Sequence, residues 1–200
     1  MEHKDKLIDF VLNNENRKAE SLLTKIREAS ECDTYADARE KILLIETAKS
    51  LNDNLPNFYA DVKKLTVDLF ESNVSVKDAI DFLCAKVKDS LKAERQTAYL
   101  KALAYTRENL CSNQLSVSSA AEYAGISQTG LIKLFAENMG ITPGDYIGKG
   151  RCEKSLELLK ENASVESTAL SVGFSSVESY IRAFRKHMGM TPGMWKKKYL

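Results

Sequence analysis

The stretch ALSVGFSSVESYIRAFRKHMGMTP, residues Ala169–Pro192, combines a short apolar segment, a glycine turn and an amphipathic segment rich in positive charge. In the second segment Tyr180, Ala183, Phe184 and Met188 recur at helical spacing, which is typical of one buried helix face. Gly173 supplies the permissive backbone that a tight turn requires. The stretch therefore predicts two helices joined by a turn, with the second helix presenting its cationic side to solvent.

The same pattern occurs earlier in the chain, as LSVSSAAEYAGISQTGLIKLFAENMGITP at Leu115–Pro143. Gly125 is matched 48 positions later by Gly173, and Ser127 and Ser175 are placed to cap the second helix of each copy. The apolar positions of the earlier second helix follow the same spacing and are Leu131, Leu134, Phe135 and Met139. The chain thus contains an internal repeat of two helix-turn-helix units, at about 116–139 and 164–188.

Helical spacing of apolar residues extends through almost the whole chain, and strand-like alternation is hard to find. The first half predicts helices near 4–12, 16–30, 34–51, 56–71 and 75–95, with a further helix, AYLKALAYTRENL, before the repeat. Between the repeat copies, GDYIGKGRCEKSLELLK predicts a linker helix at about 144–160. The fold class is therefore all-α: a helical N-terminal domain, residues 1–96, and two helix-turn-helix subdomains joined by a linker helix, residues 97–200.

Charge divides the chain at the same place. Residues 1–97 hold 16 Lys and Arg against 19 Asp and Glu, whereas residues 98–200 hold 13 against 9, a net charge of +4. The second half is therefore the candidate for a polyanionic partner. The chain has no apolar run long enough to cross a bilayer, and its four cysteines lack metal-ligand spacing, so we expect a cytoplasmic protein with reduced thiols and without membrane contact.

The exposed faces of the two second helices indicate double-stranded DNA. An isoleucine beside a cation occurs at the same place in each, Ile132 with Lys133 and Ile181 with Arg182. In a major groove Lys or Arg reads guanine edges, and an aliphatic group contacts the thymine methyl. The alternative is that the isoleucines lie under a neighbouring helix and the cations are merely solvated. The candidate DNA-binding residues are Gln128, Thr129, Ile132, Lys133, Ser176, Val177, Glu178, Ile181, Arg182, Arg185, Lys186 and His187.

These residues resemble the DNA-binding domain of the AraC/XylS family of bacterial transcription regulators. The resemblance rests on AEYAGIS and LFAENMGITP, followed by ALSVGFSSVESYIRAFRKHMGMTP, and it covers about residues 98–200. It implies that the second helix of each unit enters one of two successive major grooves of promoter DNA. It also implies base contacts from both helices, with Arg185, Lys186 and His187 better suited to phosphates, and activation through RNA polymerase.

The N-terminal half is less informative. KLIDFVLNNENRKAESLLTKIRE is similar to the helical segment that follows the sensor in some membrane-bound AraC-type regulators, which implies that the chain is the cytoplasmic part of a larger sensor-regulator. Ile80, Leu83, Val87 and Leu91 approach a heptad seam. This seam either packs inside its own domain, which we favour, or pairs with a second chain in a homodimer.

An enzyme is not expected. The chain has two histidines, no phosphate-binding glycine loop and no nucleophile with a partner base, so it predicts no catalytic residue, metal or cofactor. We therefore predict a sequence-specific transcriptional activator. The alternative is an all-helical adaptor whose degenerate helix-turn-helix units bind protein instead of DNA.

Overall fold

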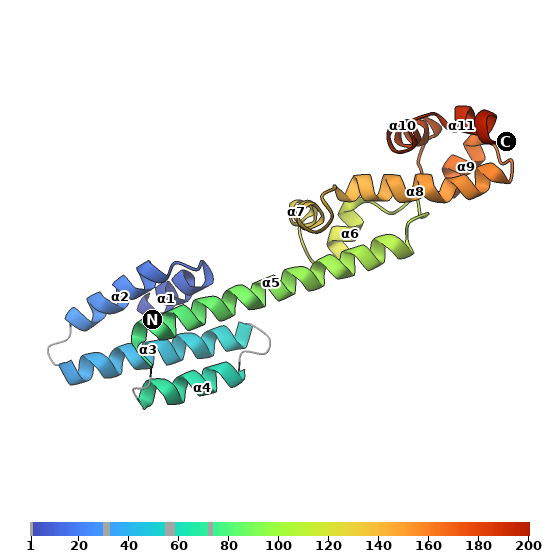
Figure 1. Cartoon of the computed structure of the whole chain (residues 1–200). Helices are drawn as coiled ribbons and strands as arrows, with labels where there is room; N and C mark the ends of the chain where they lie inside the picture. The colour runs from blue at the N-terminus through green and yellow to red at the C-terminus, as the bar shows by residue number, and fades with distance from the viewer. Residues whose placement is uncertain (1, 30–32, 55–58, 72–73) are drawn as a thin grey trace. The chain divides into compact units, whose positions relative to one another are not determined.

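The computed structural model describes residues 2–29, 33–54, 59–71 and 74–200. Within these ranges the chain forms helices and turns and no strand (Figure 1), so the all-α prediction is confirmed. The helices are α1 (Glu2–Leu12), α2 (Asn16–Glu28), α3 (Asp33–Asn54), α4 (Tyr59–Phe70), α5 (Val76–Glu108), α6 (Val117–Tyr123), α7 (Gln128–Met139), α8 (Pro143–Lys160), α9 (Val165–Ser171), α10 (Val177–Met188) and α11 (Pro192–Tyr199). None of these described helices has the length and apolar character needed to span a bilayer.

The chain divides into two compact units, unit 1 (Met1–Glu94) and unit 2 (Arg95–Leu200). The boundary falls inside α5, where the sequence had predicted two separate helices. That prediction was wrong because residues 91–97, LKAERQT, contain neither glycine nor proline and are mostly strong helix formers. The start predicted for the fourth helix, residue 56, lies outside the described residues.

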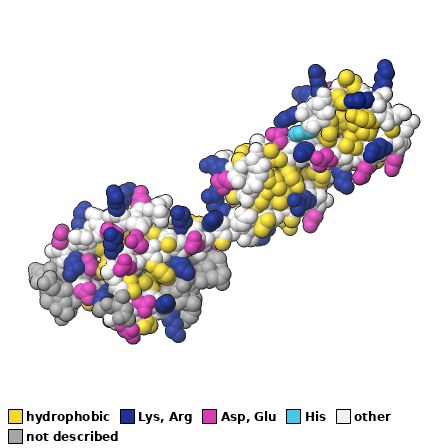
Figure 2. All heavy atoms as spheres, in the orientation of Figure 1, with side chains coloured by type: hydrophobic (Ala, Val, Ile, Leu, Met, Phe, Trp, Pro, Cys, Tyr) yellow, Lys and Arg dark blue, Asp and Glu magenta, His cyan; other side chains and the backbone are white. Residues whose placement is uncertain are grey.

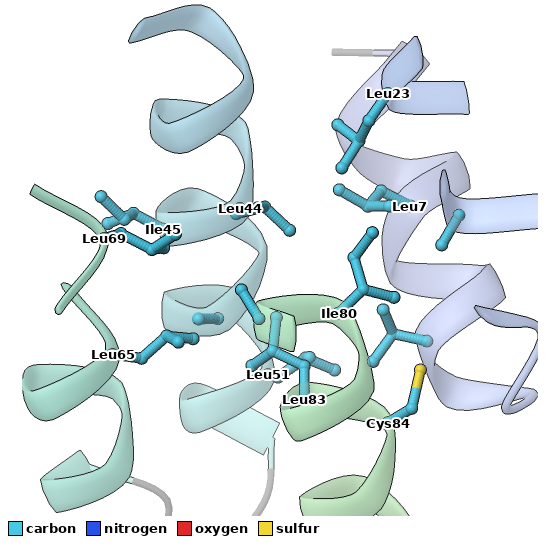
Figure 3. Close-up of a cluster of buried hydrophobic side chains, with 14 of the residues drawn as sticks. Leu7, Leu23, Leu44, Ile45, Leu51, Leu65, Leu69, Ile80, Leu83 and Cys84 are labelled. Atoms are coloured by element: carbon cyan, nitrogen blue, oxygen red, sulfur yellow. The ribbon is translucent and has the colours of Figure 1, made fainter. Parts of the chain in front are cut away.

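Unit 1 packs α1 to α4 and the first part of α5 around one apolar core. Figure 3 shows Leu7 of α1, Leu44 and Leu51 of α3, and Ile80 and Leu83 of α5 converging in this core. The predicted seam on α5 belongs to this core. Ile80, Leu83 and Val87 are buried in it, and Leu91 is 37% exposed. The seam therefore packs within its own unit, the alternative that the sequence favoured.

Unit 2 contains two three-helix subdomains of the same design. In the first, α6 and α7 pack on the C-terminal part of α5 through a cluster that includes Tyr99, Leu131 and Phe135. In the second, α9 and α10 pack on α8 through a cluster that includes Tyr180 and Phe184. The apolar faces predicted for the two second helices are therefore buried, with their Met and Ala members partly so. We call α5 and α8 the scaffold helices.

Hydroxyl side chains cap the helices of unit 2. Ser127 accepts a hydrogen bond from the backbone N–H of Gly130 at the start of α7, as predicted. At the start of α10 the cap is Ser176, which accepts from the N–H of Ser179, so the prediction of Ser175 was wrong. The reason is one extra residue in the second turn: the glycines of the repeat are 48 positions apart, whereas the capping serines are 49 apart.

The three described cysteines differ in exposure. Cys84 and Cys152 are buried free cysteines, and burial raises the pKa of the Cys84 thiol to about 11 and that of the Cys152 thiol to about 12. Cys111 is an exposed free cysteine. Cys32 lies outside the described residues.

One buried cation joins the two subdomains. Arg151 of α8 is 8% exposed, and its guanidinium donates hydrogen bonds to the carbonyl oxygens of Leu110 at 2.8 Å and Ser112 at 2.7 Å. The guanidinium also lies 5.5 Å from the centre of the Phe174 ring, in the second helix-turn-helix. We call this contact, with the loop 110–115, the joint. It fixes the end of α5 to α8 and to the turn between α9 and α10.

Gly173 completes the joint. Its φ is +89°, and a Cβ built on it would lie 2.7 Å from the carbonyl oxygen of Cys111, closer than any real contact. Gly125, the corresponding residue of the first copy, also has a positive φ, +71°, but a Cβ there would meet no atom within 4 Å. Glycine is therefore required for backbone conformation at both turns, and for close approach only at Gly173.

These two glycines give a matched test of the joint. We expect Gly125→Ala to destabilise unit 2 by about 1–2 kcal/mol, the cost of a left-handed conformation for a residue with a Cβ. We expect Gly173→Ala to cost about 2–5 kcal/mol, because overpacking adds to the same conformational term. The measurement is urea unfolding followed by the fluorescence of Trp195, the one tryptophan, which packs against the core of the second subdomain. Equal losses for the two variants would contradict the close approach.

Replacing the cation tests the joint from the other side. Arg151→Met keeps an apolar stem but leaves buried carbonyl oxygens without their donor, so we expect a loss of about 2–4 kcal/mol in the free energy of unfolding. Lys154→Met, an exposed cation on the same helix, is the control and should change stability by less than about 0.5 kcal/mol. A small effect of Arg151→Met would show that water replaces the guanidinium.

Candidate nucleic-acid interface

The outward face of α7 follows from its buried face. Because Leu131, Leu134 and Phe135 point into the core of the first subdomain, the opposite side of the helix is left to solvent. All four residues predicted for this face are exposed: Gln128, Thr129, Ile132 and Lys133. Ile132 is 43% exposed, a large apolar side chain in water beside a cation. The side chains needed for base contacts in a major groove are therefore accessible on α7.

The face of α10 is more mixed. Glu178, Arg182 and Arg185 are exposed, whereas Ile181 is only partly exposed. Val177 is also partly buried, and it packs against the core cluster of the second subdomain. The hydroxyl of Ser176 is engaged as the cap of α10. Of the residues predicted here, Glu178, Arg182, Arg185 and Lys186 are thus the exposed ones.

Two of the three predicted phosphate contacts lie against α8. The ammonium group of Lys186 is ion-paired with the carboxylate of Asp145, which also accepts a hydrogen bond from the Thr142 hydroxyl at 3.1 Å. These hydrogen bonds, first that from Lys186, lower the pKa of Asp145. His187 is partly buried, with its Nε2 only 3.2 Å from where a Cβ on Gly148 would lie. Arg185, the third of these residues, has no ion pair with α8 and no such close approach to it in the described structure.

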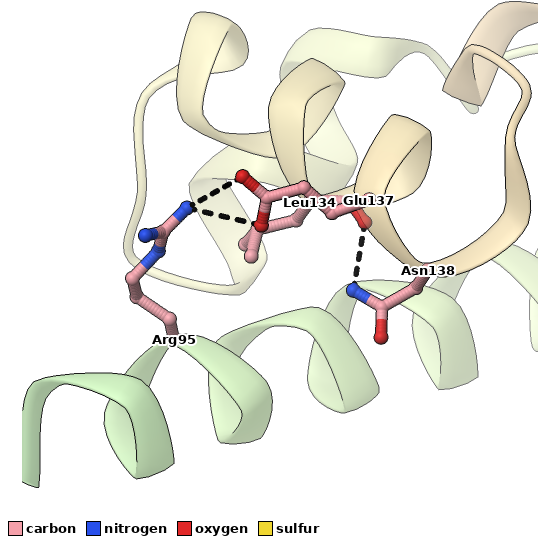
Figure 4. A network of polar contacts seen from close by, with 4 residues as sticks. All are labelled: Arg95, Leu134, Glu137 and Asn138. Carbon is pink, nitrogen blue, oxygen red and sulfur yellow. Dashed lines mark hydrogen bonds and ion pairs between the residues drawn. The ribbon is translucent and has the colours of Figure 1, made fainter. Parts of the chain in front are cut away.

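The first subdomain has an ion pair at the same place with the signs reversed. Arg95 of α5 donates from Nη2 to both carboxylate oxygens of Glu137, each at 3.2 Å (Figure 4). Glu137 of α7 occupies the repeat position of Lys186 in α10, 49 residues later. In both subdomains, therefore, the second helix is tied to its scaffold helix by an ion pair. Sequence reasoning assigned Lys186 to a phosphate and identified neither ion pair, because the partners are 42 and 41 residues apart in the chain.

Free positive charge is concentrated on the second subdomain. On α7 the one cation is Lys133, whereas α10 offers Arg182 and Arg185. Helix α11 adds Lys197 and Lys198, both exposed, while Lys196 donates a hydrogen bond to the carbonyl of Ala163 at 2.8 Å. Figure 2 shows Lys and Arg side chains projecting around this end of unit 2. Sequence reasoning missed Lys197 and Lys198, although the run KKK near the C-terminus was a visible signal.

Comparison with known proteins gives matches over unit 2. A family model described as a helix-turn-helix domain matches residues 120–198. The HTH-type transcriptional activator AarP of Providencia stuartii is 30% identical over 90 residues, which cover 44% of this chain and 67% of AarP. The probable transcription factor PqrA of Proteus vulgaris is 31% identical over 84 residues, which cover 42% of this chain and 69% of PqrA.

A solved structure also aligns with this part of the fold. The C-terminal domain of AraT, a response regulator from Geobacillus stearothermophilus, shares 25% identity with a TM-score of 0.48, and the match covers 52% of this chain and 86% of that domain. Two further relatives are much longer than the match, since the chain covers 29% and 30% of their lengths.

The ion pair between Lys186 and Asp145 gives a prediction about DNA affinity. In Asp145→Asn the lysine loses its anionic partner and becomes available to a phosphate. We expect tighter binding to all DNA sequences alike, and a logarithmic salt dependence that is steeper by about 0.9, the value for one added phosphate contact. Glu157→Gln removes one negative charge from the exposed side of the same helix and controls for net charge. Fluorescence anisotropy with an arbitrary duplex at several salt concentrations measures both slopes; identical slopes would contradict the prediction.

Proposed function

This chain belongs to the AraC/XylS family of DNA-binding transcription regulators, and we propose that it activates transcription by inserting α7 and α10 into successive major grooves of a promoter. Its family and its relatives are regulators, not enzymes. We infer activation from AarP, which is named a transcriptional activator. Contact with RNA polymerase, and action in the cytoplasm, belong to the same proposal.

The observation that carries the two-groove proposal is the equivalence of the two exposed faces. Lys133 and Arg182 are 49 positions apart in the repeat and both are exposed. Both helices are seen nearly end-on in Figure 1, so their axes are nearly parallel to one line. Helix α8 has 18 residues, a length of about 27 Å, which is close to the roughly 34 Å between successive major-groove turns. The joint supports the proposal, because it restrains the two subdomains against one another.

The exposed side chains suggest a division of roles. We assign base contacts to Thr129, Ile132 and Lys133 in the first subdomain, and to Glu178, Ile181 and Arg182 in the second. A carboxylate such as that of Glu178 can accept from the N4 amino group of cytosine, and an arginine can read guanine. We assign phosphate contacts to Arg185, Lys197 and Lys198, since all three are exposed cations. We assign a structural role in the second subdomain to Ser176, Val177 and His187.

Unit 1 is assigned the reception of a signal. The apolar seam of α5 is used in its own core, so this seam is not left over for a second chain. Pairing into a homodimer would have to use another surface. We therefore propose that the main role of unit 1 is to receive a signal, and that unit 1 forms a dimer only in response to that signal.

Two arginines on one helix separate base reading from phosphate binding. After selection of bound duplexes from a random pool, we expect Arg182→Ala to lose about 1–3 kcal/mol on the selected site and little on a scrambled one. We expect Arg185→Ala to weaken both duplexes alike and to reduce the salt slope by about 0.9. Titration of each variant with both duplexes, at two salt concentrations, measures these effects.

The same titration tests the function itself. A protein adaptor with degenerate helix-turn-helix units would show no salt-sensitive retardation of any duplex, and no sequence would be enriched by selection. If both arginine variants behaved identically on the two duplexes, the assignment of Arg182 to base reading would be wrong, although DNA binding would stand.

A further inference from the structure

Unit 1 contains a cavity of about 500 Å³ that has no part in the DNA interface. It is open to solvent and lies between one face of α2, one face of α3 and the start of α1. Its volume is in the range of small-molecule sites in proteins, roughly 300–1,000 Å³. The residues that line it are His3, Lys4, Leu22, Lys25, Ile26, Ala29, Arg39, Ile42, Leu43 and Glu46.

We call the aliphatic residues that line the cavity its floor. Leu22 and Ile26 of α2 are one helical turn apart and face Ile42 and Leu43 of α3. Ile42 is 51% exposed, although Leu44 and Ile45 beside it are buried in the core of the unit. None of the described residues that line the cavity is aromatic. Exposed aliphatic surface in a concave site favours a ligand with an apolar body.

We call the cations that line the cavity its rim. Lys4, Lys25 and Arg39 belong to it, together with His3, and Glu46 is the one carboxylate among the described residues that line the cavity. No ion pair is found for these three cations within the described part of the chain. The surrounding half of the sequence is acidic, with 19 Asp and Glu against 16 Lys and Arg in residues 1–97. The concentration of cations at one opening is therefore a local feature, opposite in sign to the unit that carries it.

We propose that this cavity binds a small amphipathic anion, with an apolar body on the floor and a carboxylate, sulfonate or phosphate head group at the rim. The pairing of an apolar floor with cations that have no ion-pair partner among the described residues carries the assignment, because each part alone is common on a protein surface. A bound anion would contact α1, α2 and α3 together and stabilise unit 1 by mass action. This site is independent of how unit 2 recognises DNA.

Two matched dyes test the charge requirement in the full-length chain. The probes are 8-anilinonaphthalene-1-sulfonate and N-phenyl-1-naphthylamine, which share one ring system and differ in the sulfonate. We expect the sulfonate dye to bind with one-to-one stoichiometry and about tenfold more tightly than the neutral dye, and decanoate to displace it. Added salt should lower the affinity for the sulfonate dye and leave the affinity for the neutral dye unchanged.

Four variants locate the binding. We expect Arg39→Gln and Lys25→Gln each to lower the affinity for the sulfonate dye about threefold to fivefold, the range of an exposed charge pair. Neither substitution should change the affinity for the neutral dye. Ile42→Ser should lower the affinity for both dyes. Lys64→Gln, an exposed cation on α4 outside the cavity, is the control and should change neither. All four side chains are exposed, and far-ultraviolet circular dichroism confirms that each variant is folded.

Three results would overturn the proposal: equal affinity for the two dyes, an equal loss in Lys64→Gln, or binding of many dye molecules without saturation, as a loosely packed state would give. None of these results would bear on DNA binding, which is measured separately with duplexes. Conversely, failure to bind any DNA would leave the dye titration valid.

Discussion

The arrangement of the DNA-binding unit depends on one buried guanidinium. Arg151 satisfies backbone carbonyls in the loop after α5 while its charged face lies on Phe174, so a single side chain contacts both helix-turn-helix subdomains. An uncompensated charge in this position would be strongly unfavourable, and uncapped carbonyls would be costly as well. The guanidinium and the loop therefore require each other, and the missing side chain of Gly173 lets the second turn close over them.

The two copies of the repeat share a core and differ in their surfaces. Both second helices bury aromatic and aliphatic residues at equivalent positions, which explains why each subdomain is compact. The free cations, however, are concentrated on α10 and α11, so we expect the second subdomain to supply most of the phosphate affinity. The first subdomain, with Thr129, Ile132 and Lys133, is then better suited to reading bases than to holding the backbone.

Much of this architecture was accessible from the sequence, because helical spacing and turn residues are local signals. The repeat, the buried faces and the cap at Ser127 follow from residues within a few positions of one another. The roles of Arg151, Glu137 and Lys186 do not, since each depends on a partner more than 35 residues away. The continuity of α5 was also missed: an exposed helical segment has no buried face whose periodicity could indicate it.

The reversed signs of the two ion pairs disfavour docking of α7 or α10 on the wrong scaffold helix during folding. Similar cores would allow α7 to dock on α8, or α10 on α5. In the first mispairing Glu137 would face Asp145, and in the second Lys186 would face Arg95, so both would bring like charges together. Each correct pair is worth little by itself at an exposed position. The free-energy difference between correct and exchanged docking, however, includes both the attraction that is lost and the repulsion that is gained. This difference favours docking of α7 on α5 and of α10 on α8.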